Sequence, residues 1–260
     1  KLPEFVNKMM ENKWLGSKTE QGFYKKEGKD ILTLDLDTLT YRPNKKASFA
    51  TLELTKTIEK PIDRFKVLVT GKDKAGDFYR KNFASMFQYC SNRIPEITDA
   101  FYKIDDAMKA GFGWENGPFE IWDAIGIEKG IELMKAEGYQ PASWVTDMLA
   151  SGNTSFYSIK DGATHFYSIT NKKVEKIPGQ DAFIILNNIR ESKKIWNNSD
   201  SIITDLGDGI INLEFTSKMN SIGAGVLQGI NKAIDIAEKD YNGLVIGNQG
   251  ANFSVGANLG

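Results

Sequence analysis

Residues 201–247 decide the fold prediction: SIITDLGDGIINLEFTSKMNSIGAGVLQGINKAIDIAEKDYNGLVIG. Residues 201–206 and 210–215 predict two strands, since apolar and polar residues alternate in part, and the Gly-Asp-Gly at 207–209 predicts the turn between them. Apolar residues then mark one face of a long helix: Ile222, Val226, Leu227, Ile230, Ala233, Ile234 and Ala237. Residues 244–246 predict a further, buried strand. The stretch therefore predicts a ββαβ unit.

The chain ahead of this unit is predicted to be mostly helical. Residues 3–12 suit a short helix, and 77–110 suit helices with an apolar stripe that includes Phe83, Phe87 and Cys90. Cys90 on such a stripe is expected to be a core thiol rather than a reactive one. Thr98 is expected to cap the helix that ends at Ala110. Further helices are predicted from Pro118 and over 127–137 and 141–150.

Residues 156–169 predict a β-hairpin. Two aromatic-rich runs flank Asp161-Gly162, a pair that tolerates positive φ in a tight turn. His165 is expected to be a strand residue, because no second metal ligand or nucleophile accompanies it. Residues 31–34 and 65–69 could each be a strand or a buried helix. Residues 170–200 are polar and predict an inter-domain connector.

Composition excludes several classes of function. The chain has 260 residues, with 33 Lys and Arg against 34 Asp and Glu, so its net charge of −1 gives no general attraction to nucleic acid. One cysteine and one histidine exclude a disulfide within the chain and a zinc site of the Cys/His type. No apolar run is long enough to span a membrane, and no signal peptide is visible. A cytoplasmic setting is therefore expected.

Two segments suggest an internal repeat. Residues 5–10, FVNKMM, resemble residues 144–149, WVTDML. Each is followed by a loop and then by Phe-Tyr, at 23–24 and at 156–157. We therefore expect two copies of one helical unit, although aromatic-rich helix ends are common enough for a chance similarity.

The usual catalytic patterns are absent from the sequence. No Gly-x-Gly-x-x-Gly follows a strand, no phosphate-binding loop ends in Lys-Ser/Thr, and no Ser or Cys has a credible His partner. The pairs Asp105-Asp106 and Glu115/Glu120 are carboxylates near helix starts, where they are expected to serve the helix dipole and solvent.

One segment could bind a ligand through its backbone. Residues 248–258 follow the last predicted strand, and Gly256 permits a tight turn there. Bare N–H groups in such a turn can stabilise a developing oxyanion. The alternative is an ordinary strand-to-helix turn.

The same residues carry a family resemblance. Residues 243–259, GLVIGNQGANFSVGANL, resemble the first oxyanion segment of the crotonase (enoyl-CoA hydratase/isomerase) family, and 217–222, SKMNSI, resemble its CoA-side segment. Residues 104–120, with IDDAM and GFGWENGPFE, resemble the C-terminal helical domain of 3-hydroxyacyl-CoA dehydrogenases. Residues 14–24, WLGSKTEQGFY, resemble the end of an earlier copy of that domain.

The order of these parts resembles the bacterial bifunctional 3-hydroxyacyl-CoA dehydrogenase/enoyl-CoA hydratase of fatty-acid β-oxidation. This implies a mixed fold: an all-α dehydrogenase C-terminal domain, a helical repeat like that of 6-phosphogluconate dehydrogenase, followed by the N-terminal ββαβ part of an α/β crotonase fold. The implied domains are 1–27, the end of a first repeat; 28–76, a connector; 77–160, a second repeat; 161–200, hairpin and linker; and 201–260, a truncated crotonase domain.

The resemblance also implies site residues. The backbone N–H of Ala257 would be one oxyanion donor, and the acyl-CoA substrate would meet Lys218, Met219, Gly256, Ala257, Asn258 and Leu259. Many hydratases have Asp where Asn258 stands, so side-chain partners of that Asp are in doubt, whereas the backbone donor is not. The second donor and two catalytic glutamates are expected beyond Gly260.

Cofactor and partners follow from the same resemblance. NAD would bind a domain ahead of Lys1, the CoA thioester would be the substrate, and no metal is implied. The chain is thus expected to be an internal, catalytically incomplete fragment, and a homo-oligomer or a thiolase partner is possible. Two alternatives stay open: a non-catalytic acyl-CoA-binding or scaffold module, and a crotonase-family isomerase or hydrolase fused to helical repeats.

Overall fold

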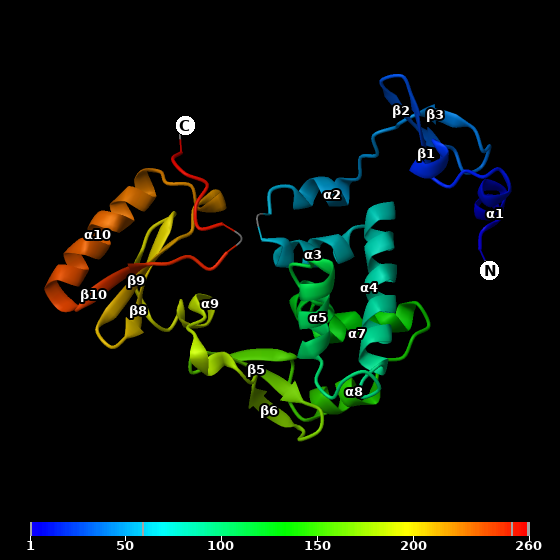
Figure 1. Ribbon diagram of the computed structural model, residues 1–260. Helices are drawn as coiled ribbons and strands as arrows, with labels where there is room; N and C mark the ends of the chain where they lie inside the picture. The colour runs from blue at the N-terminus through cyan, green and yellow to red at the C-terminus, as the bar shows by residue number, and fades with distance from the viewer. Residues whose placement is uncertain (1, 59, 251, 259–260) are drawn as a thin grey trace. The chain divides into compact units, whose positions relative to one another are not determined.

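The computed structural model describes residues 2–58, 60–250 and 252–258, and the chain forms two compact units, residues 1–56 and 57–260 (Figure 1). The first unit begins with helix α1 (Glu4–Glu11) and the short 3-10 turn η1 (Ser17–Thr19). Three antiparallel strands follow in the order β1 (Tyr24–Glu27), β2 (Asp30–Leu34) and β3 (Tyr41–Pro43), and helix α2 (Ala50–Thr55) ends the unit. Its buried apolar side chains are Met9, on α1, and Leu34, on β2.

The second unit starts with a block of helices. These are α3 (Pro61–Thr70), α4 (Lys74–Asn92), α5 (Tyr102–Phe112), α6 (Pro118–Ile125), α7 (Ile127–Ala136) and α8 (Ser143–Ala150). The apolar stripe of α4 meets α6, where the rings of Phe87 and Trp122 stack with centroids 4.7 Å apart. Both side chains are fully buried, so this aromatic contact lies at the centre of the helical core.

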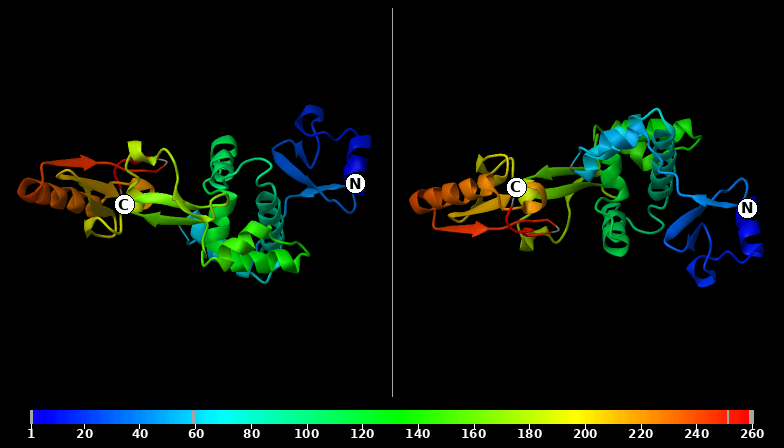
Figure 2. Two further views of the ribbon diagram at one scale, coloured as in Figure 1. Left: turned by 90° about the horizontal axis from the view of Figure 1, so that it is seen from below. Right: turned by 90° about the horizontal axis from the view of Figure 1, so that it is seen from above.

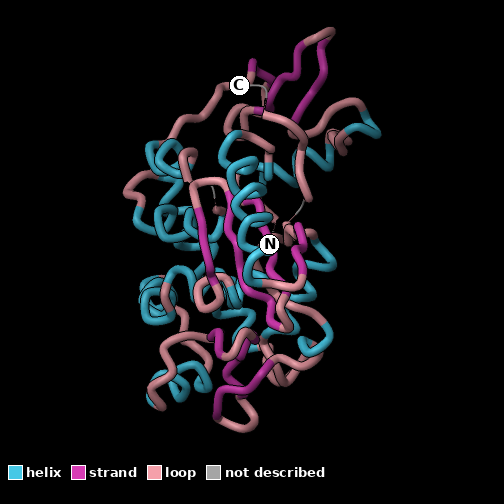
Figure 3. Tube along the Cα trace, turned by 90° about the vertical axis from the view of Figure 1, so that its left-hand side faces the viewer, coloured by secondary structure: helices cyan, strands magenta, loops and turns pink. Residues whose placement is uncertain are grey.

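A small antiparallel sheet closes the helical block. Its strands are β4 (Tyr157–Lys160), β5 (Ala163–Ser168) and β6 (Lys173–Lys176), and Figure 3 draws the strands in magenta. Asp161 and Gly162 have φ of 52° and 74°, which confirms the predicted tight hairpin. The expectation of an all-α repeat is therefore corrected: short strands follow the helices, here and after α1.

The last part of the second unit is a layered sheet and helix with a hydrophobic core of its own. A 3-10 turn η2 (Gln180–Ala182) and helix α9 (Leu186–Ile189) lead to a sheet of strand order β10-β9-β8-β7, namely β10 (Gly243–Ile246), β9 (Ile210–Phe215), β8 (Ser201–Gly207) and β7 (Lys194–Asn197). Helix α10 (Ala224–Asp240) lies along this sheet, as both views of Figure 2 show. Its buried Val226 and Ala233 pack on Ile203, Ile211 and Leu213.

The predicted ββαβ order is confirmed. Strand β8 pairs antiparallel with β9, and α10 then carries the chain across so that β10 pairs parallel with β9. Two parallel strands need a long connection between them, and α10 supplies it here. Within the helical block, the predicted helices from Pro118 and over 127–137 and 141–150 are also confirmed.

Other sequence expectations needed the structure. Residues 31–34 form a strand, whereas 65–69 lie in helix α3. The predicted cap at Thr98 is wrong, because α5 begins at Tyr102 with Phe101 as its N-cap, and the Thr98 hydroxyl forms hydrogen bonds with the backbone of Ala100 instead. The polar stretch 170–200 contains strand β7, which pairs with β8 and so belongs to the last sheet.

Candidate functional site

The loop after β10 is held at its first residue by an asparagine. Asn248 Oδ1 accepts a hydrogen bond from Phe215 N at 2.7 Å, and Asn248 Nδ2 donates to Phe253 O at 2.6 Å. One side chain thus connects the end of β9 with the middle of the loop. This fixes where residues 253–258 start their return towards α10.

The loop then pairs with the segment that precedes α10. Ile222 N donates to Gly256 O at 2.9 Å, and Asn258 N donates to Ile222 O at 2.9 Å, which makes a parallel bridge between Ile222 and Ala257. Gly256 has φ of +95°, a conformation that strongly favours glycine.

The bridge decides where Ala257 aims its own backbone. Since the groups on either side of Ala257 bond to Ile222, its N–H points away from that segment. Ala257 is exposed, and among the residues that the structure describes none accepts its N–H. The arrangement leaves a fixed donor facing solvent.

The other predicted substrate residues either lie beside this loop or are outside the residues that the structure describes. Lys218 and Met219 are exposed on the 3-10 turn η3 (Lys218–Asn220), where Met219 and Asn220 both have φ of 55°. Asn220 Nδ2 donates to Asn252 O at 2.9 Å and so joins this turn to the loop. The structure therefore brings the 217–222 and 252–258 segments together, whereas Leu259 lies outside the described residues.

Sequence reasoning assigned no role to Gln249. Its Oε1 accepts from Leu186 N at 2.7 Å and its Nε2 donates to Ile184 O at 2.6 Å. A second contact holds the same connector: Arg190 donates from Nε and Nη2 to both carboxylate oxygens of Glu214, at 3.0 and 2.7 Å, and Glu214 is buried. The sequence shows only that the side-chain amide of Gln249 stands in a glycine-containing loop. Its hydrogen-bond partners, Leu186 and Ile184, lie 63 and 65 residues away in the sequence.

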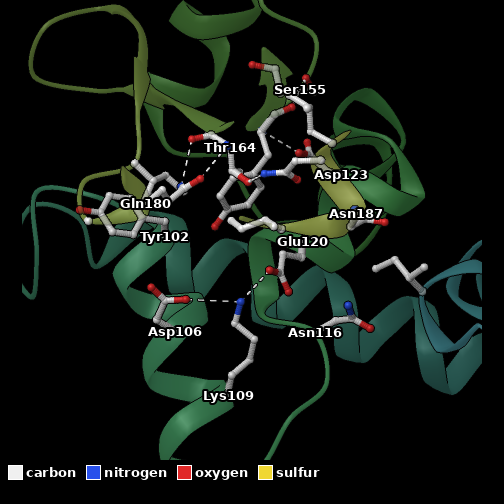
Figure 4. Close-up of a pocket in the computed structure, with 18 of the residues that line it drawn as sticks. Tyr102, Asp106, Lys109, Asn116, Glu120, Asp123, Ser155, Thr164, Gln180 and Asn187 are labelled. Atoms are coloured by element: carbon white, nitrogen blue, oxygen red, sulfur yellow. Dashed lines mark hydrogen bonds and ion pairs between the residues drawn. The ribbon is translucent and has the colours of Figure 1, made fainter. Parts of the chain in front are cut away.

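A larger pocket of about 900 Å³ opens in the helical block (Figure 4). Lys109 points into it from α5 and pairs with Glu120 at 2.7 Å and with Asp106 at 3.4 Å. On another wall, Gln180 bonds both backbone groups of Thr164, at 2.8 and 3.2 Å. The cation of this pocket is thus already matched by carboxylates, and apolar side chains such as Ile62 and Ile177 make up much of the rest.

Asp105, behind this pocket, is fully buried. Its Oδ1 accepts from Phe119 N at 2.9 Å, and its Oδ2 accepts from Glu120 N at 3.0 Å and from the Tyr157 hydroxyl at 2.7 Å. It therefore caps the N-terminus of α6 from a different helix, α5. The predicted helix-dipole role is confirmed, but the expected solvent exposure is wrong for Asp105 and right for Asp106.

Asp123 plays a matching part at the other end of α6. Its two carboxylate oxygens accept from Phe156 N at 2.7 Å and from Tyr157 N at 2.9 Å, which ties α6 to the start of β4. Burial raises the pKa of Asp105 and that of Asp123 to about 7 each, against the opposing effect of their hydrogen-bond donors. The described hydrogen bonds of both carboxyl groups go to backbone N–H groups or to the Tyr157 hydroxyl, so we assign Asp105 and Asp123 to holding α6 and β4 in place.

The remaining reactive groups are structural. Cys90 packs against the helical core, and burial, with the charge of Asp105, raises the pKa of its thiol to about 11. His165 lies in β5 with Nδ1 3.1 Å from Ala163 O, as expected for a strand residue.

Residues 2–58, 60–250 and 252–258 contain no cluster of three or more His, Cys, Asp or Glu side chains placed to hold a metal ion. Nor does any helix within those ranges have the length and apolarity to cross a membrane.

Three glycines follow β9 at the start of α10, Gly223, Gly225 and Gly229, and glycines in such a place can form a dinucleotide site. Their spacing differs from Gly-x-Gly-x-x-Gly. A Cβ at Gly225 would overlap the Asp200 carboxylate, and one at Gly229 would overlap Ser201 Oγ. These glycines therefore allow close packing of α10 on the sheet, and this glycine-rich turn does not fit NAD.

Comparisons with known proteins give a consistent set of relatives. The chain is 42% identical over 260 residues, all of its length, to a Bacillus subtilis protein described as "Probable 3-hydroxyacyl-CoA dehydrogenase", and it covers 33% of that protein. It is 26% identical over 258 residues to a Rickettsia felis protein described as "Putative fatty acid oxidation complex trifunctional enzyme", with 98% of this chain and 31% of the relative covered. A Rickettsia prowazekii protein with the same description matches at 26% over 257 residues, 97% of this chain and 31% of its own.

No protein-family model matches the sequence, and no solved structure matches it. The chain spans about a third of the length of the curated relatives it matches. The whole chain is thus similar to a segment that makes up about one third of each relative, and these relatives are described as enzymes of 3-hydroxyacyl-CoA and fatty-acid oxidation.

Proposed function

We propose that this chain is part of a fatty-acid β-oxidation enzyme that hydrates enoyl-CoA and oxidises 3-hydroxyacyl-CoA with NAD. The observation that carries the proposal is the end-to-end match to the Bacillus subtilis relative, in a chain whose last unit has the β8–β9–α10–β10 order. In the terms of this proposal, residues 1–27 end a first dehydrogenase helical repeat and 77–160 form a second. Residues 28–76 and 161–200 lie between these parts in the sequence, and 201–260 begin a crotonase domain.

For the hydratase step, we assign the Ala257 N–H as one of two donors to the thioester oxygen. Its support is geometric: Gly256 O and Asn258 N are both held by Ile222, so the Ala257 N–H has a fixed direction without an acceptor of its own among the described residues. Charge develops on the thioester oxygen as water adds to the conjugated bond. A preoriented donor of this kind stabilises that charge by about 3 kcal/mol.

The substrate would run past the neighbouring segments. Gly256 and Asn258 flank Ala257, Leu259 is proposed as a substrate residue from the sequence alone, and Lys218 and Met219 lie on the turn that Asn220 joins to the loop. An exposed ammonium such as that of Lys218 suits the phosphates of CoA. The second N–H donor and the two glutamates that handle water and proton are proposed to come from other parts of the intact enzyme.

For the dehydrogenase step, this chain is proposed to shape the acyl-CoA cleft and not to hold the cofactor. NAD accepts the hydride in such enzymes, but the glycine-rich start of α10 does not fit it, and no step of hydride transfer is assigned to this chain. The intact enzyme is proposed to act in the cytoplasm, as a homo-oligomer or with a thiolase.

The test uses the intact polypeptide and the variant Ala257→Pro, which removes the proposed donor. We expect hydration of an enoyl-CoA, followed as loss of the conjugated thioester absorbance, to fall by about 100-fold or more. Ala257→Gly retains the N–H and serves as the matched control, with circular dichroism to show that both variants fold.

Other outcomes would change the function. Acyl-CoA binding without turnover in the intact polypeptide would favour a binding or scaffold module. Double-bond migration or thioester cleavage in place of hydration would favour an isomerase or a hydrolase. Equal hydration by the Pro and Gly variants would contradict the assignment of Ala257.

A further inference from the structure

Two segments of the chain share one local architecture. Helix α1, a loop and the meander β1–β2–β3 have the same order as α8, a loop and β4–β5–β6. In the first segment the rings of Phe5 and Phe23 meet edge to face with centroids 6.3 Å apart, and Leu34 N donates to Phe23 O at 2.9 Å.

The second segment repeats both contacts. The rings of Trp144 and Phe156 lie with centroids 5.7 Å apart, and Tyr167 N donates to Phe156 O at 3.0 Å. Tyr24 lies opposite Thr33 in the first sheet, as Tyr157 lies opposite Phe166 in the second. Residues 23–24 and 156–157 therefore occupy equivalent positions.

In the second segment, helix α6 covers this position. The carboxylate of Asp123 accepts from the N–H groups of both Phe156 and Tyr157. The Phe156 ring has its centroid 5.1 Å from those of Phe119 and Trp122, and Phe156 is only 1% exposed. One helix thus supplies a carboxylate and, four and one residues before it, two aromatic rings.

In the first segment, the equivalent position is uncovered. Phe23 and Tyr24 are 50% and 62% exposed. No described residue accepts the Phe23 N–H, and Tyr24 is in a non-hydrogen-bonded pair, so its N–H points out of the sheet.

A groove lies directly beside Phe23. It has a volume of about 220 Å³, and Phe23 forms one wall of it together with apolar side chains that include Met10, Trp14 and Leu15. We call the surface formed by Met10, Leu15, Phe23 and Tyr24 the uncovered face.

We propose that the uncovered face binds a helix that precedes Lys1 in the intact polypeptide and carries a carboxylate that accepts from Phe23 N and Tyr24 N. Apolar side chains one and four residues before that carboxylate pack on Phe23 and in the groove. The position in the sequence follows from the second segment, where the covering helix α6 comes before α8. A carboxylate suits two adjacent N–H donors because each oxygen can accept one bond.

A second copy of this chain is a poorer occupant. Its own α6 already uses Asp123 on Phe156 and Tyr157, and it would have to leave its core to reach another molecule. The proposal rests on the internal repeat, which belongs to the proposed function, but not on either reaction. Loss of hydratase or dehydrogenase activity would therefore leave it standing.

Amide hydrogen exchange tests the proposal. The intact polypeptide and the 260-residue chain are compared at the amides of Phe23 and Tyr24, with Phe156 and Tyr157 as internal references for a covered position. We expect exchange at 23 and 24 to be at least about 100-fold slower in the intact polypeptide. Equal exchange in the two proteins, or a reading frame with no helix ahead of Lys1, would overturn the proposal.

Two controls separate the remaining explanations. The Leu34 amide, which bonds Phe23 O, should be protected in both proteins and shows that the first unit is folded. Protection at 23 and 24 that grows with concentration of the 260-residue chain would overturn the proposal in favour of a second copy. In the intact polypeptide, Phe23→Ala should abolish the extra protection at Tyr24, whereas Ile31→Ala, an exposed position of the same sheet, should not.

Discussion

Replacing Asp105 by alanine should destabilise the helical block severely, although its neighbour Asp106 should tolerate the same change. Asp105 is fully buried and accepts three hydrogen bonds, from Phe119 N, Glu120 N and the Tyr157 hydroxyl. Its side chain also packs where Gly117 leaves room, since a Cβ on Gly117 would overlap Asp105. Asp106 is exposed, and its nearest ion-pair partner, Lys109, is 3.4 Å away.

The magnitude follows from the groups that Asp105→Ala leaves behind. A buried donor without an acceptor costs about 1–3 kcal/mol, and here three donors lose their acceptor together. Water can reach some of them, so we expect a loss of about 3–5 kcal/mol in the free energy of unfolding. For a unit of this size that corresponds to a fall of about 10 °C in Tm. Asp106→Ala should change stability by less than about 0.5 kcal/mol.

The assay is urea unfolding of the 260-residue chain, followed by the fluorescence of its tryptophans, since Trp122 on α6 is fully buried. Tyr157→Phe adds a double-mutant cycle. It should cost about 1 kcal/mol in the wild-type background and close to nothing when Asp105 is already alanine, because the hydrogen bond is then absent. Equal stability of the two aspartate variants would refute the reasoning.

Three further outcomes are expected. Burial raises the folded-state pKa of Asp105 and Asp123 to about 7, so above about pH 4 the folded chain keeps protons that the unfolded chain has lost. The free energy of unfolding should therefore fall as pH rises from 5 to 7 and level off above pH 7, and urea midpoints measure this. An Asp105→Asn, Asp123→Asn double variant that keeps the same pH dependence would contradict the explanation. Gly130→Ala should cost about 1–3 kcal/mol, because its Cβ would overlap Trp122 Nε1, whereas Gly111→Ala, with no atom near its Cβ, should be neutral or stabilising in the same urea experiment. The 260-residue chain with 3-hydroxyacyl-CoA and NAD should produce no NADH, since the cofactor is proposed to bind another part of the intact enzyme and the glycines at the start of α10 do not fit it; a rise in NADH absorbance that scales with protein would show this to be wrong.

Sequence patterns predicted the elements whose signals are local. The tight turn at Asp161-Gly162 and the apolar face of α10 each depend on residues within a few positions of one another. Such patterns were enough for the ββαβ order and for the hairpin. The strand β1, Tyr-Lys-Lys-Glu, and the strand β7, Lys-Ile-Trp-Asn, gave no such signal, because both are short edge strands that exist through pairing with a neighbour.

The candidate oxyanion segment, residues 248–258, also has features that the sequence predicts and features that only the structure decides. Residues 248–258 were singled out in the sequence by their glycines after a strand. The direction of the Ala257 N–H depends on the bridge to Ile222, which is 35 positions earlier. Gln249 could not be assigned a role from the sequence, since the backbone groups it bonds lie on a connector of no distinctive pattern.

The sequence by itself determined the ββαβ order over residues 201–247 and the hairpin at 156–169, because propensity and apolar spacing act over a few residues. It also placed a carboxylate pair, Asp105-Asp106, near the glycine-rich turn before α6. Only the tertiary structure decided that Asp105 caps α6 in the core while Asp106 faces the pocket and solvent. Adjacent helical residues point about 100° apart, and which of the two directions is buried depends on how α6 and β4 pack against α5.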